Sequence, residues 1–512
     1  MRLRTPALIT IVAVAGACII QRPVIKQLDG PGLSQEVTSP VKAHLKDGST
    51  VLFTNGVSRQ GNDIVGSGNR FGLDAQEATR VTRLSLDSIA GMESFGRHIN
   101  AGASVALSML GVVGGAVATA GLAVAIFGSC PTIYADSAGT ELLQAESFSY
   151  AIAALFEQRD VDRLRLTSTP DGKVVLHIRN EMLETHYINH LELIEVKHAL
   201  NEEVLPDQSG QVLAVSNERL TASIGDRAGR DISQVTHESD GSVFSTINTR
   251  LASVTANDLD DYIDVTVDAP PSADTVALEL DMRNSLLNTV LLYDHILGAP
   301  GLGSLDYVGK DLENISNAVD VGRWYSSNMG MRVSVRDNGS YRRITRIGDS
   351  GPIAFHRMAV LVPAIRSDDG KVHVRLSFVA DDWRIDRISV AGKWHRPTAR
   401  NIAVARVTMP DPSQTAKTIT ALAQPDEAYL ITSPGQSFTA EFDVGRGNDS
   451  ERTWLVAAQG YYSEWVRGDW IKTASGKPFT PTNEVLVDAI RGWRLKQNSM
   501  EASFYTQRIV AR

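Results

Sequence analysis

The chain has 512 residues, with 50 Lys or Arg against 59 Asp or Glu, which gives a net charge of −9. This acidic balance excludes a basic nucleic-acid groove that covers the whole protein. A hydrophobic fraction of 43% and a charged fraction of 21% are typical of folded chains, not of disordered or polytopic membrane ones. At roughly 100–200 residues per domain, the length predicts about three domains. The only two cysteines, Cys18 and Cys130, exclude a disulfide scaffold and a multi-cysteine zinc site.

The first residues predict export. Arg2 and Arg4 form a positively charged start, and the stretch 6–14 that follows is apolar and uncharged. Ala15-Gly16-Ala17 then supplies the small residues of a cleavage site. We therefore expect residues 1–17 to be a signal peptide.

Ala15-Gly16-Ala17-Cys18, with its apolar lead-in, resembles the lipobox of bacterial lipoproteins, apart from Ala15, where that family usually has Leu. The resemblance implies that Cys18 becomes the lipid-bearing first residue of the mature chain. It also implies a location in the bacterial cell envelope, on the periplasmic or outer-membrane side. An ordinary cleaved signal and an uncleaved anchor are the alternatives. A lipid on Cys18 would leave Cys130 without a partner for an intrachain disulfide.

A second resemblance covers short runs further along. It rests on residues 130–134, 146–150 and 156–160, which are similar to a pattern in uncharacterised exported proteins of bacteria. This similarity supports export and implies nothing about activity.

Residues 99–129 carry no charge and are rich in Gly and Ala, which predicts an apolar helix long enough to cross a bilayer of about 30 Å. Gly111 and Gly115 form a G-x-x-x-G pair, which allows close helix packing in a membrane. The flanking charges oppose a single crossing, because residues 128–158 contain no Lys or Arg. The segment therefore spans the membrane, lies in it without crossing, or packs inside protein. We favour association with the membrane.

The rest of the pattern predicts a mainly β, multi-domain fold of β-sandwich-like units. Closely spaced turn signals such as Asn55-Gly56 indicate a small N-terminal β-meander. Beyond residue 130, short strands such as Lys173–Arg179 and Val372–Phe378 are separated by turn clusters. Apolar residues spaced three and four apart between Leu305 and Val319 predict part of an inserted α-hairpin. The expected division is a tether at 18–40, a small β domain at 41–98, the apolar helix at 99–129, a β domain at 130–283, the α-hairpin at 284–326, a β domain at 327–410 and a C-terminal β domain at 411–512.

Four large aromatic residues within ten positions form the best candidate ligand surface. They are Tyr461, Tyr462, Trp465 and Trp470. In exported β domains such rings stack on sugars or peptides, since each offers a rigid apolar face with a polar edge. Use in the core or in a domain contact is the alternative, and we favour it.

Three groups of polar residues raise the possibility of metal binding. His186 and His190 would share one face of a helix, as metal ligands do, but a strand would hold them about 13 Å apart. The surrounding residues are typical of a strand, so we interpret both histidines as structural. The acidic run 257–261, and the weaker group around Trp383, offer oxygen ligands without the EF-hand spacing, so a turn or helix cap is the preferred interpretation. No cofactor and no metal are predicted.

These observations lead to two hypotheses about function. The first is a membrane-anchored envelope protein, more binding or structural than enzymatic, whose partners are the membrane and carbohydrate or another envelope protein. The second is an exported hydrolase that acts on envelope or extracellular polymer. No catalytic residue is assigned, because the chain lacks a G-x-S-x-G elbow, a P-loop and strand–helix alternation.

Overall fold

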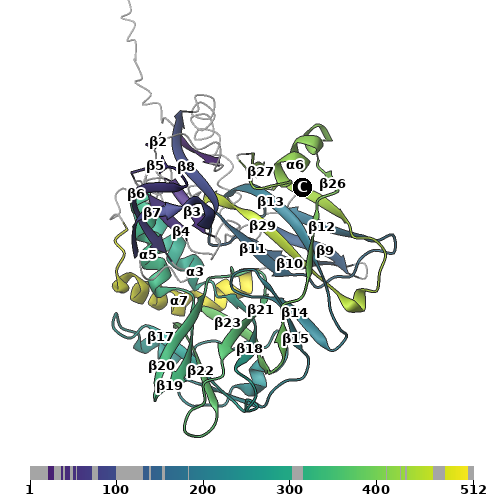
Figure 1. Cartoon of the computed structure of the whole chain (residues 1–512). Helices are drawn as coiled ribbons and strands as arrows, with labels where there is room; N and C mark the ends of the chain where they lie inside the picture. Colours follow the sequence, from purple (N-terminus) through teal and green to yellow (C-terminus); the bar gives the residue numbers. More distant parts are fainter. Residues whose placement is uncertain are drawn as a thin grey trace, which may run out of the picture.

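The structure of the protein is a computed structural model. It describes residues 21–27, 36–38, 41–45, 50–53, 55–71, 79–99, 131–137, 140–152, 156–182, 184–301, 315–410, 412–426, 428–432, 435–464 and 479–504. The fold is mainly β, built from several antiparallel sheets with few helices, which confirms the predicted fold class (Figure 1).

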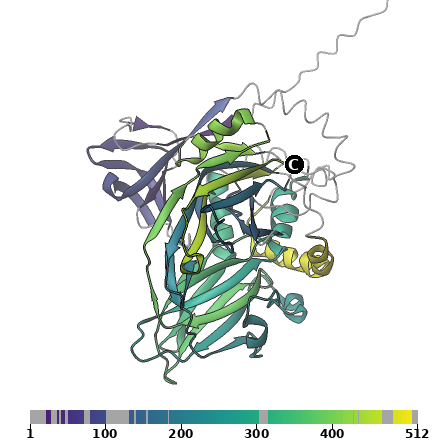
Figure 2. The same ribbon diagram turned by 90° about the vertical axis from the view of Figure 1, so that its right-hand side faces the viewer.

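The N-terminal part forms an eight-stranded sheet, which stands at one side of the molecule in purple in Figure 2. Alternate residues of its strands supply a small separate core, as Val41, Ala43 and Leu45 do in β3. The strand order is β1-β8-β3-β4-β6-β5-β2, and β7 also pairs with β6. The strands are β1 (Gln21–Gln27), β2 (Glu36–Val37), β3 (Val41–Leu45), β4 (Thr50–Phe53), β5 (Val57–Gln60), β6 (Asp63–Phe71), β7 (Thr79–Ser85) and β8 (Ile89–Ile99), with the short helix η1 (Leu86–Ser88) before β8.

The expected tether at 18–40 is partly wrong, because it contains β1 and β2. All seven residues of β1 pair with β8, from Gln21 opposite Ile99 to Gln27 opposite Glu93. The partner strand β8 lies more than 60 positions later, so the pairing could not be recognised from this stretch alone. Ile99, the first residue of the expected apolar helix, belongs to β8. Residues 1–20, with Cys18, and residues 100–130 lie outside the described residues.

A first sandwich packs two five-stranded sheets face to face. One has the order β10-β9-β12-β28-β26, and the other β11-β29-β13-β25 with β27 on β13. Phe438 and Phe442 of the former meet Leu191 and Trp454 of the latter in one buried core. The strands are β9 (Thr132–Ser137), β10 (Thr140–Glu146), β11 (Gln158–Arg163), β12 (Lys173–Arg179), β13 (Glu184–Lys197), β25 (Ala399–Ala403), β26 (Arg406–Thr408), β27 (Leu430–Thr432), β28 (Ser437–Asp443) and β29 (Arg452–Glu464).

A second sandwich packs the sheet β16-β17-β22-β19-β20 on the sheet β21-β18-β23. Its core includes Ile263, Val333 and Leu376 from the former and Leu278 and Val360 from the latter. The strands are β16 (Ala222–Asp226), β17 (Asp260–Val267), β18 (Thr275–Asn284), β19 (Met331–Asp337), β20 (Ser340–Ile347), β21 (His356–Pro363), β22 (Val372–Val379) and β23 (Trp383–Ala391).

A small sheet lies between the two sandwiches and has an apolar layer on each face. It consists of β14 (Glu202–Pro206), β15 (Val212–Ser216) and β24 (Trp394–His395). Val204 and Ala214 pack with Ile194 of the first sandwich. Leu205 and Leu213 pack with residues of β18, β21 and β23 in the second. The inner strands bury both faces, so β13 is buried at every position from Leu191 to Val196, with Glu192 and Glu195 included. Figure 1 shows this sequence of sheets from β9 and β12, through β14 and β15, to β19 and β22.

The second sandwich is inserted in the chain of the first. The chain leaves the first sandwich after β13, builds β14 and β15, forms the whole second sandwich over 222–391, and returns through β24 to β25. β12 consequently pairs with β28, and β11 with β29. The expected boundaries near residues 283, 326 and 410 do not coincide with the boundaries between these cores. The physical reason is that β11 and β12 pair with strands more than 250 residues further along the chain.

Helices cover one end of the second sandwich, and α2, α3, η4, α5 and α7 share an apolar cluster. Within the expected α-hairpin at 284–326, the structure has helical residues at 287–297 and 315–328, whereas 302–314 lie outside the described residues. These helices connect β18 to β19, two strands of one sandwich, so the insertion is within a β unit and not between two. The helices are η3 (Ser233–Thr236), α2 (Asn248–Ser253), α3 (Leu287–Val290), the π-helical turn η4 (Leu291–Leu297), α5 (Ile315–Asn328) and α7 (Asn483–Phe504), with η7 (Pro412–Gln414), α6 (Thr415–Leu422) and η8 (Asp449–Glu451) on the first sandwich. No helix in the described part of the chain is both long and apolar enough to cross a membrane.

Candidate functional site

The first two residues of the predicted aromatic surface are buried. Tyr461 and Tyr462 lie on β29 and are 9% and 2% exposed. The ring of Tyr461 stacks on Tyr187 with 4.5 Å between centroids, and Tyr429 meets it edge-on at 5.6 Å. The Tyr462 hydroxyl donates a hydrogen bond to the Ser149 carbonyl. Tyr461 therefore belongs to the first core and Tyr462 is buried as well, which agrees with the alternative interpretation. Trp465 and Trp470 lie outside the described residues.

The two histidines four residues apart lie on a strand, β13, as expected. His186 is fully buried, with its Nε2 3.3 Å from Glu184 Oε2, whereas His190 lies beyond a bulge in the pairing with β29. Burial lowers the pKa of His190, opposed by the charge of Glu192. Across the described ranges, no group of three or more His, Cys, Asp or Glu residues is placed to hold a metal ion.

Carboxylates of the acidic run at 257–261 form ion pairs with arginines. Asp258 pairs with Arg227 and Arg250, both at 3.0 Å, and Asp260 pairs with Arg332 at 2.7 Å. These contacts tie the start of β17 to its surroundings, so the residues serve as a turn and not as a cation site.

The acidic group around Trp383 anchors the C-terminal helix. Asp381 is fully buried, and its Oδ2 accepts a hydrogen bond from the Trp493 indole N–H of α7 at 2.6 Å. Arg384 donates to the same carboxylate at 2.8 Å. The neighbouring Asp382 accepts hydrogen bonds from the amide groups of Asn284 and Asn288, and burial together with the charge of Asp349 holds its pKa well above the usual range.

A second set of ionisable groups, which the sequence did not indicate, lies where β11 of the first sandwich meets β18 and β21 of the second. His356 Nδ1 lies 2.5 Å from Asp162 Oδ1, and Arg165 pairs with Asp281 at 2.9 Å. Glu203 of β14 pairs with Arg357 at 2.9 Å, which links the small middle sheet to the same group. We call this set the charged junction; it comprises Asp160, Asp162, Arg163, Arg165, Glu203, Arg219, Glu279, Asp281, His356, Arg357 and Arg387.

Burial and neighbouring charges shift the pKa values of the charged junction. Burial, reinforced by the charge of Asp162, raises the pKa of Asp160 to about 7. Burial alone would lower the pKa of His356, but the charge and hydrogen bond of Asp162, with Asp160 and Asp281, outweigh it and raise that pKa. Burial lowers the pKa of Arg163, and the charge of Glu203 opposes that effect. The ion pairs of the charged junction connect strands of different sheets, as Asp162 of β11 and His356 of β21 do.

The charged junction predicts that stability falls as the pH rises. The folded chain keeps the Asp160 proton up to about pH 7, whereas an unfolded Asp releases it near pH 4. The contribution of Asp160 to the free energy of unfolding is therefore complete below about pH 4, and it is lost as the pH rises to about 7. His356 acts in the same direction, because its raised pKa makes its contribution complete below about pH 6.5 and lost above.

Asp160→Asn should flatten the fall in the thermal unfolding midpoint between about pH 4.5 and 8, because an amide cannot ionise. Asp171→Asn is the control. A hydrogen bond from Thr169 lowers the pKa of the exposed Asp171, so the titration of Asp171 affects stability only at acidic pH. Above about pH 5, the thermal unfolding midpoint of Asp171→Asn should change with pH as that of wild type does. Equal pH profiles for Asp160→Asn and wild type would contradict the assignment.

A buried carboxylate makes a further contact between the two sandwiches. Glu146, at the end of β10, accepts hydrogen bonds from the backbone N–H groups of Ile353 and Ala354 at 2.6 and 3.1 Å. Burial holds the pKa of Glu146 well above the usual range, although these two hydrogen bonds oppose it. Gly351 adopts φ +88°, and a Cβ there would lie 2.4 Å from the Glu146 carboxyl carbon. The loop before β21 is therefore shaped around this carboxylate.

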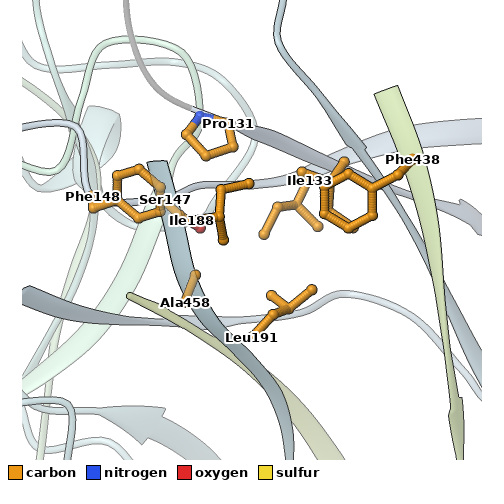
Figure 3. A pocket seen from close by; sticks show the side chains of 9 residues that line it. Pro131, Ile133, Ser147, Phe148, Ile188, Leu191, Phe438 and Ala458 are labelled. Atoms are coloured by element: carbon orange, nitrogen blue, oxygen red, sulfur yellow. The ribbon is translucent and has the colours of Figure 1, made fainter. Parts of the chain in front are cut away.

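A cavity of about 10 Å³ lies inside the first core (Figure 3). It is lined by Pro131, Ile133, Ser147, Phe148, Ile178, Ile188, Leu191, Phe438 and Ala458. Its volume is at the lower limit for one water molecule, and a bound water needs two or more polar partners. The Ser147 hydroxyl is the only polar side chain in the lining, so this cavity is a packing gap and not a substrate pocket.

The fold and these contacts define a multi-sheet β protein whose buried charged groups join one sheet to the next. No family model matches the chain. No curated protein matches it either. Among solved structures, the VP2 subviral particle of infectious bursal disease virus is 7% identical, with 70% of this chain and 92% of that chain covered and a TM-score of 0.11. A similarity of that size carries no argument about fold or function.

Proposed function

We propose that the chain is a membrane-anchored protein of the bacterial cell envelope with a binding or structural role. The observation that carries the proposal is the register of β1 and β8, in which Gln21 lies opposite Ile99. Paired strands lie about 5 Å apart. The uncharged apolar stretch that precedes Gln21 and the one that follows Ile99 are therefore attached to the fold side by side.

This arrangement supports a common anchor. A bilayer that holds residues before Gln21, or a lipid on Cys18, is within immediate reach of the residues after Ile99. Residues 100–129 are apolar over a length sufficient for a bilayer. If this segment enters and leaves the membrane through the same face, the acidic stretch 128–158 need not reach the cytoplasm. The lack of Lys and Arg in residues 128–158 then no longer opposes insertion into the membrane.

The contacts of the described charged groups support a non-enzymatic role. Catalytic carboxylates and histidines need room for a substrate next to them. Asp162 and His356 instead bind each other, Glu146 binds backbone N–H groups, and Asp381 binds Arg384 and Trp493. With Tyr461 and Tyr462 buried, another envelope protein is a better proposed partner than a carbohydrate.

The anchor is tested on the full chain in bacterial membranes. Wild type should remain in the pellet after alkaline carbonate extraction, because a chain held by apolar segments or a lipid resists it. Radioactive palmitate should label wild type and the Cys130→Ser variant, but not Cys18→Ser. Complete release of wild type by carbonate would overturn the membrane proposal. Loss of label in Cys130→Ser with label retained in Cys18→Ser would overturn the assignment of Cys18.

A further inference from the structure

A buried network of polar side chains joins helices α3 and α5 to the second sandwich. Asn284, at the end of β18, donates through Nδ2 to Asp349 Oδ1 at 3.0 Å and to Asp382 Oδ1 at 3.4 Å. Asn288 of α3 donates to the same Asp382 oxygen at 2.9 Å, and the Tyr325 hydroxyl of α5 donates to Asn288 Oδ1 at 2.8 Å. Figure 1 shows α3 and α5 above the strands β17 and β22. We call Asn284, Asn288, Tyr325, Asp349 and Asp382 the carboxyl latch.

Each of the two carboxyl groups in the latch has one oxygen atom without a hydrogen bond. Asp382 is fully buried and Asp349 is 8% exposed. Within the described ranges, neither Asp382 Oδ2 nor Asp349 Oδ2 has a hydrogen-bond partner. A buried charged oxygen without a partner is unfavourable, and a second negative charge close by adds to the cost. One proton on either Oδ2 would neutralise one group and supply a donor.

The cations around this pair do not balance two negative charges. Arg346 of β20 acts on Asp382 with its positive charge. Burial lowers the pKa of Arg346, and the charge of Asp349 opposes that effect. Arg332 of β19 also acts on Arg346, but it pairs with Asp260 at 2.7 Å. Of these two arginines, only one is left to balance two carboxylates.

The other ionisable groups close to the pair add no net positive charge. Burial, with the charges of the two carboxyl groups, raises the pKa of Tyr325 well above the usual range, so its hydroxyl group stays neutral. Asp381, in the same turn as Asp382, and Glu501 of α7 both pair with Arg384, at 2.8 and 3.4 Å. A proton held between the two carboxyl groups therefore accounts for their burial side by side.

We infer that Asp349 and Asp382 share one proton, and that this proton holds α3 and α5 on the second sandwich. The latch goes beyond the proposed anchor and does not depend on it. When the latch opens, the carboxyl groups meet water and the proton passes to the solvent. Opening would uncover part of the apolar cluster under the helices, which includes Leu287, Val290 and Met329. The fold thus contains a pH-sensitive contact that covers an apolar surface.

The latch should open more often as the pH rises. Burial, with the charge of Asp349, raises the pKa of Asp382 well above the usual range, whereas an exposed Asp releases its proton near pH 4. The closed latch therefore holds one proton more than the open latch between about pH 4 and that raised pKa. Its stabilising contribution is complete below about pH 4 and is lost as the pH rises through the raised pKa. In this range, the ratio of open to closed molecules should rise about tenfold per pH unit.

The test is hydrogen exchange of the full chain, followed by mass spectrometry between about pH 5 and 8 and corrected for the intrinsic pH dependence of exchange. Peptides from α5 should show the tenfold rise per pH unit in wild type. Asp382→Asn and Asp349→Asn should each remove it, because one remaining carboxylate is balanced by Arg346. The matched control is Asp320→Asn, which removes a 61% exposed carboxyl group from α5 itself. This control should keep the wild-type slope.

Three results would overturn the latch. The first is corrected exchange in α5 of wild type that does not change with pH. The second is a slope that persists in Asp349→Asn, since Asp382 would then titrate alone and no proton would be shared. The third is an equal loss of slope in Asp320→Asn, because the charge of the helix would then explain the pH dependence. If Asp382→Asn does not fold, the wild-type slope and Asp349→Asn still decide between these results.

Discussion

Asp162→Ala is expected to destabilise the protein by about 3 kcal/mol, because it removes one partner of a buried ion pair and leaves the other. Asp162 and His356 are only 8% and 14% exposed in their side chains, and 2.5 Å separates the paired atoms. Their elements, β11 and β21, belong to different sandwiches, so the loss falls on the contact between the two units. Urea unfolding of the full chain, followed by tryptophan fluorescence, measures the change.

The matched control for this variant is an ion pair at the surface. Lys393 and Glu218 lie 3.0 Å apart but are 79% and 73% exposed. Water and ions screen such a pair, so Glu218→Ala should change the free energy of unfolding by less than about 0.5 kcal/mol. A comparable cost for the two variants would show that the buried pair does not join the sandwiches.

Gly351→Ala is the second variant for which we expect a large loss, also of about 3 kcal/mol. A φ of +88° is unfavourable for any residue with a Cβ, by about 1–2 kcal/mol. In addition, the new methyl group would press on the Glu146 carboxyl group at 2.4 Å. The carboxylate would have to move away from the N–H groups of Ile353 and Ala354, which would then lose a buried hydrogen-bond partner.

Gly241 separates these two effects. It has φ +90°, nearly the same as Gly351, but no atom lies within 4 Å of a Cβ placed there. Gly241→Ala should therefore show the backbone cost alone, about 1 kcal/mol. Thermal unfolding of both variants measures the difference. If Gly241→Ala costs as much as Gly351→Ala, the contact with Glu146 does not determine the conformation of this loop.

Much of the local structure could be predicted from the sequence. The alternation over Lys173–Arg179 predicts β12 with the bounds that the structure has, and Val372–Phe378 falls within β22. The strand interpretation of His186 and His190 is also confirmed. These predictions succeed because a strand with one face buried repeats every two residues, and this period is visible without knowing the partner strand.

The charged junction could not be predicted in the same way. Asp162 and His356 are 194 positions apart, and each occurs in a segment that resembles many others. The role of the aromatic residues around Tyr461 could not be predicted from the sequence either. Aromatic rings suit a binding surface and a core equally well, and only the stacking of Tyr461 on Tyr187 places it in the core.

Composition and periodicity alone determined that this acidic chain is a mainly β protein with two uncharged apolar stretches and two cysteines. The tertiary structure decided that the second sandwich is inserted in the first, that buried charges join them, and that the two stretches attach side by side through β1 and β8. The physical reason is that apolar alternation records only whether a residue is buried. Which strand completes its hydrogen bonds, and which charge faces it, depends on segments tens to hundreds of residues away.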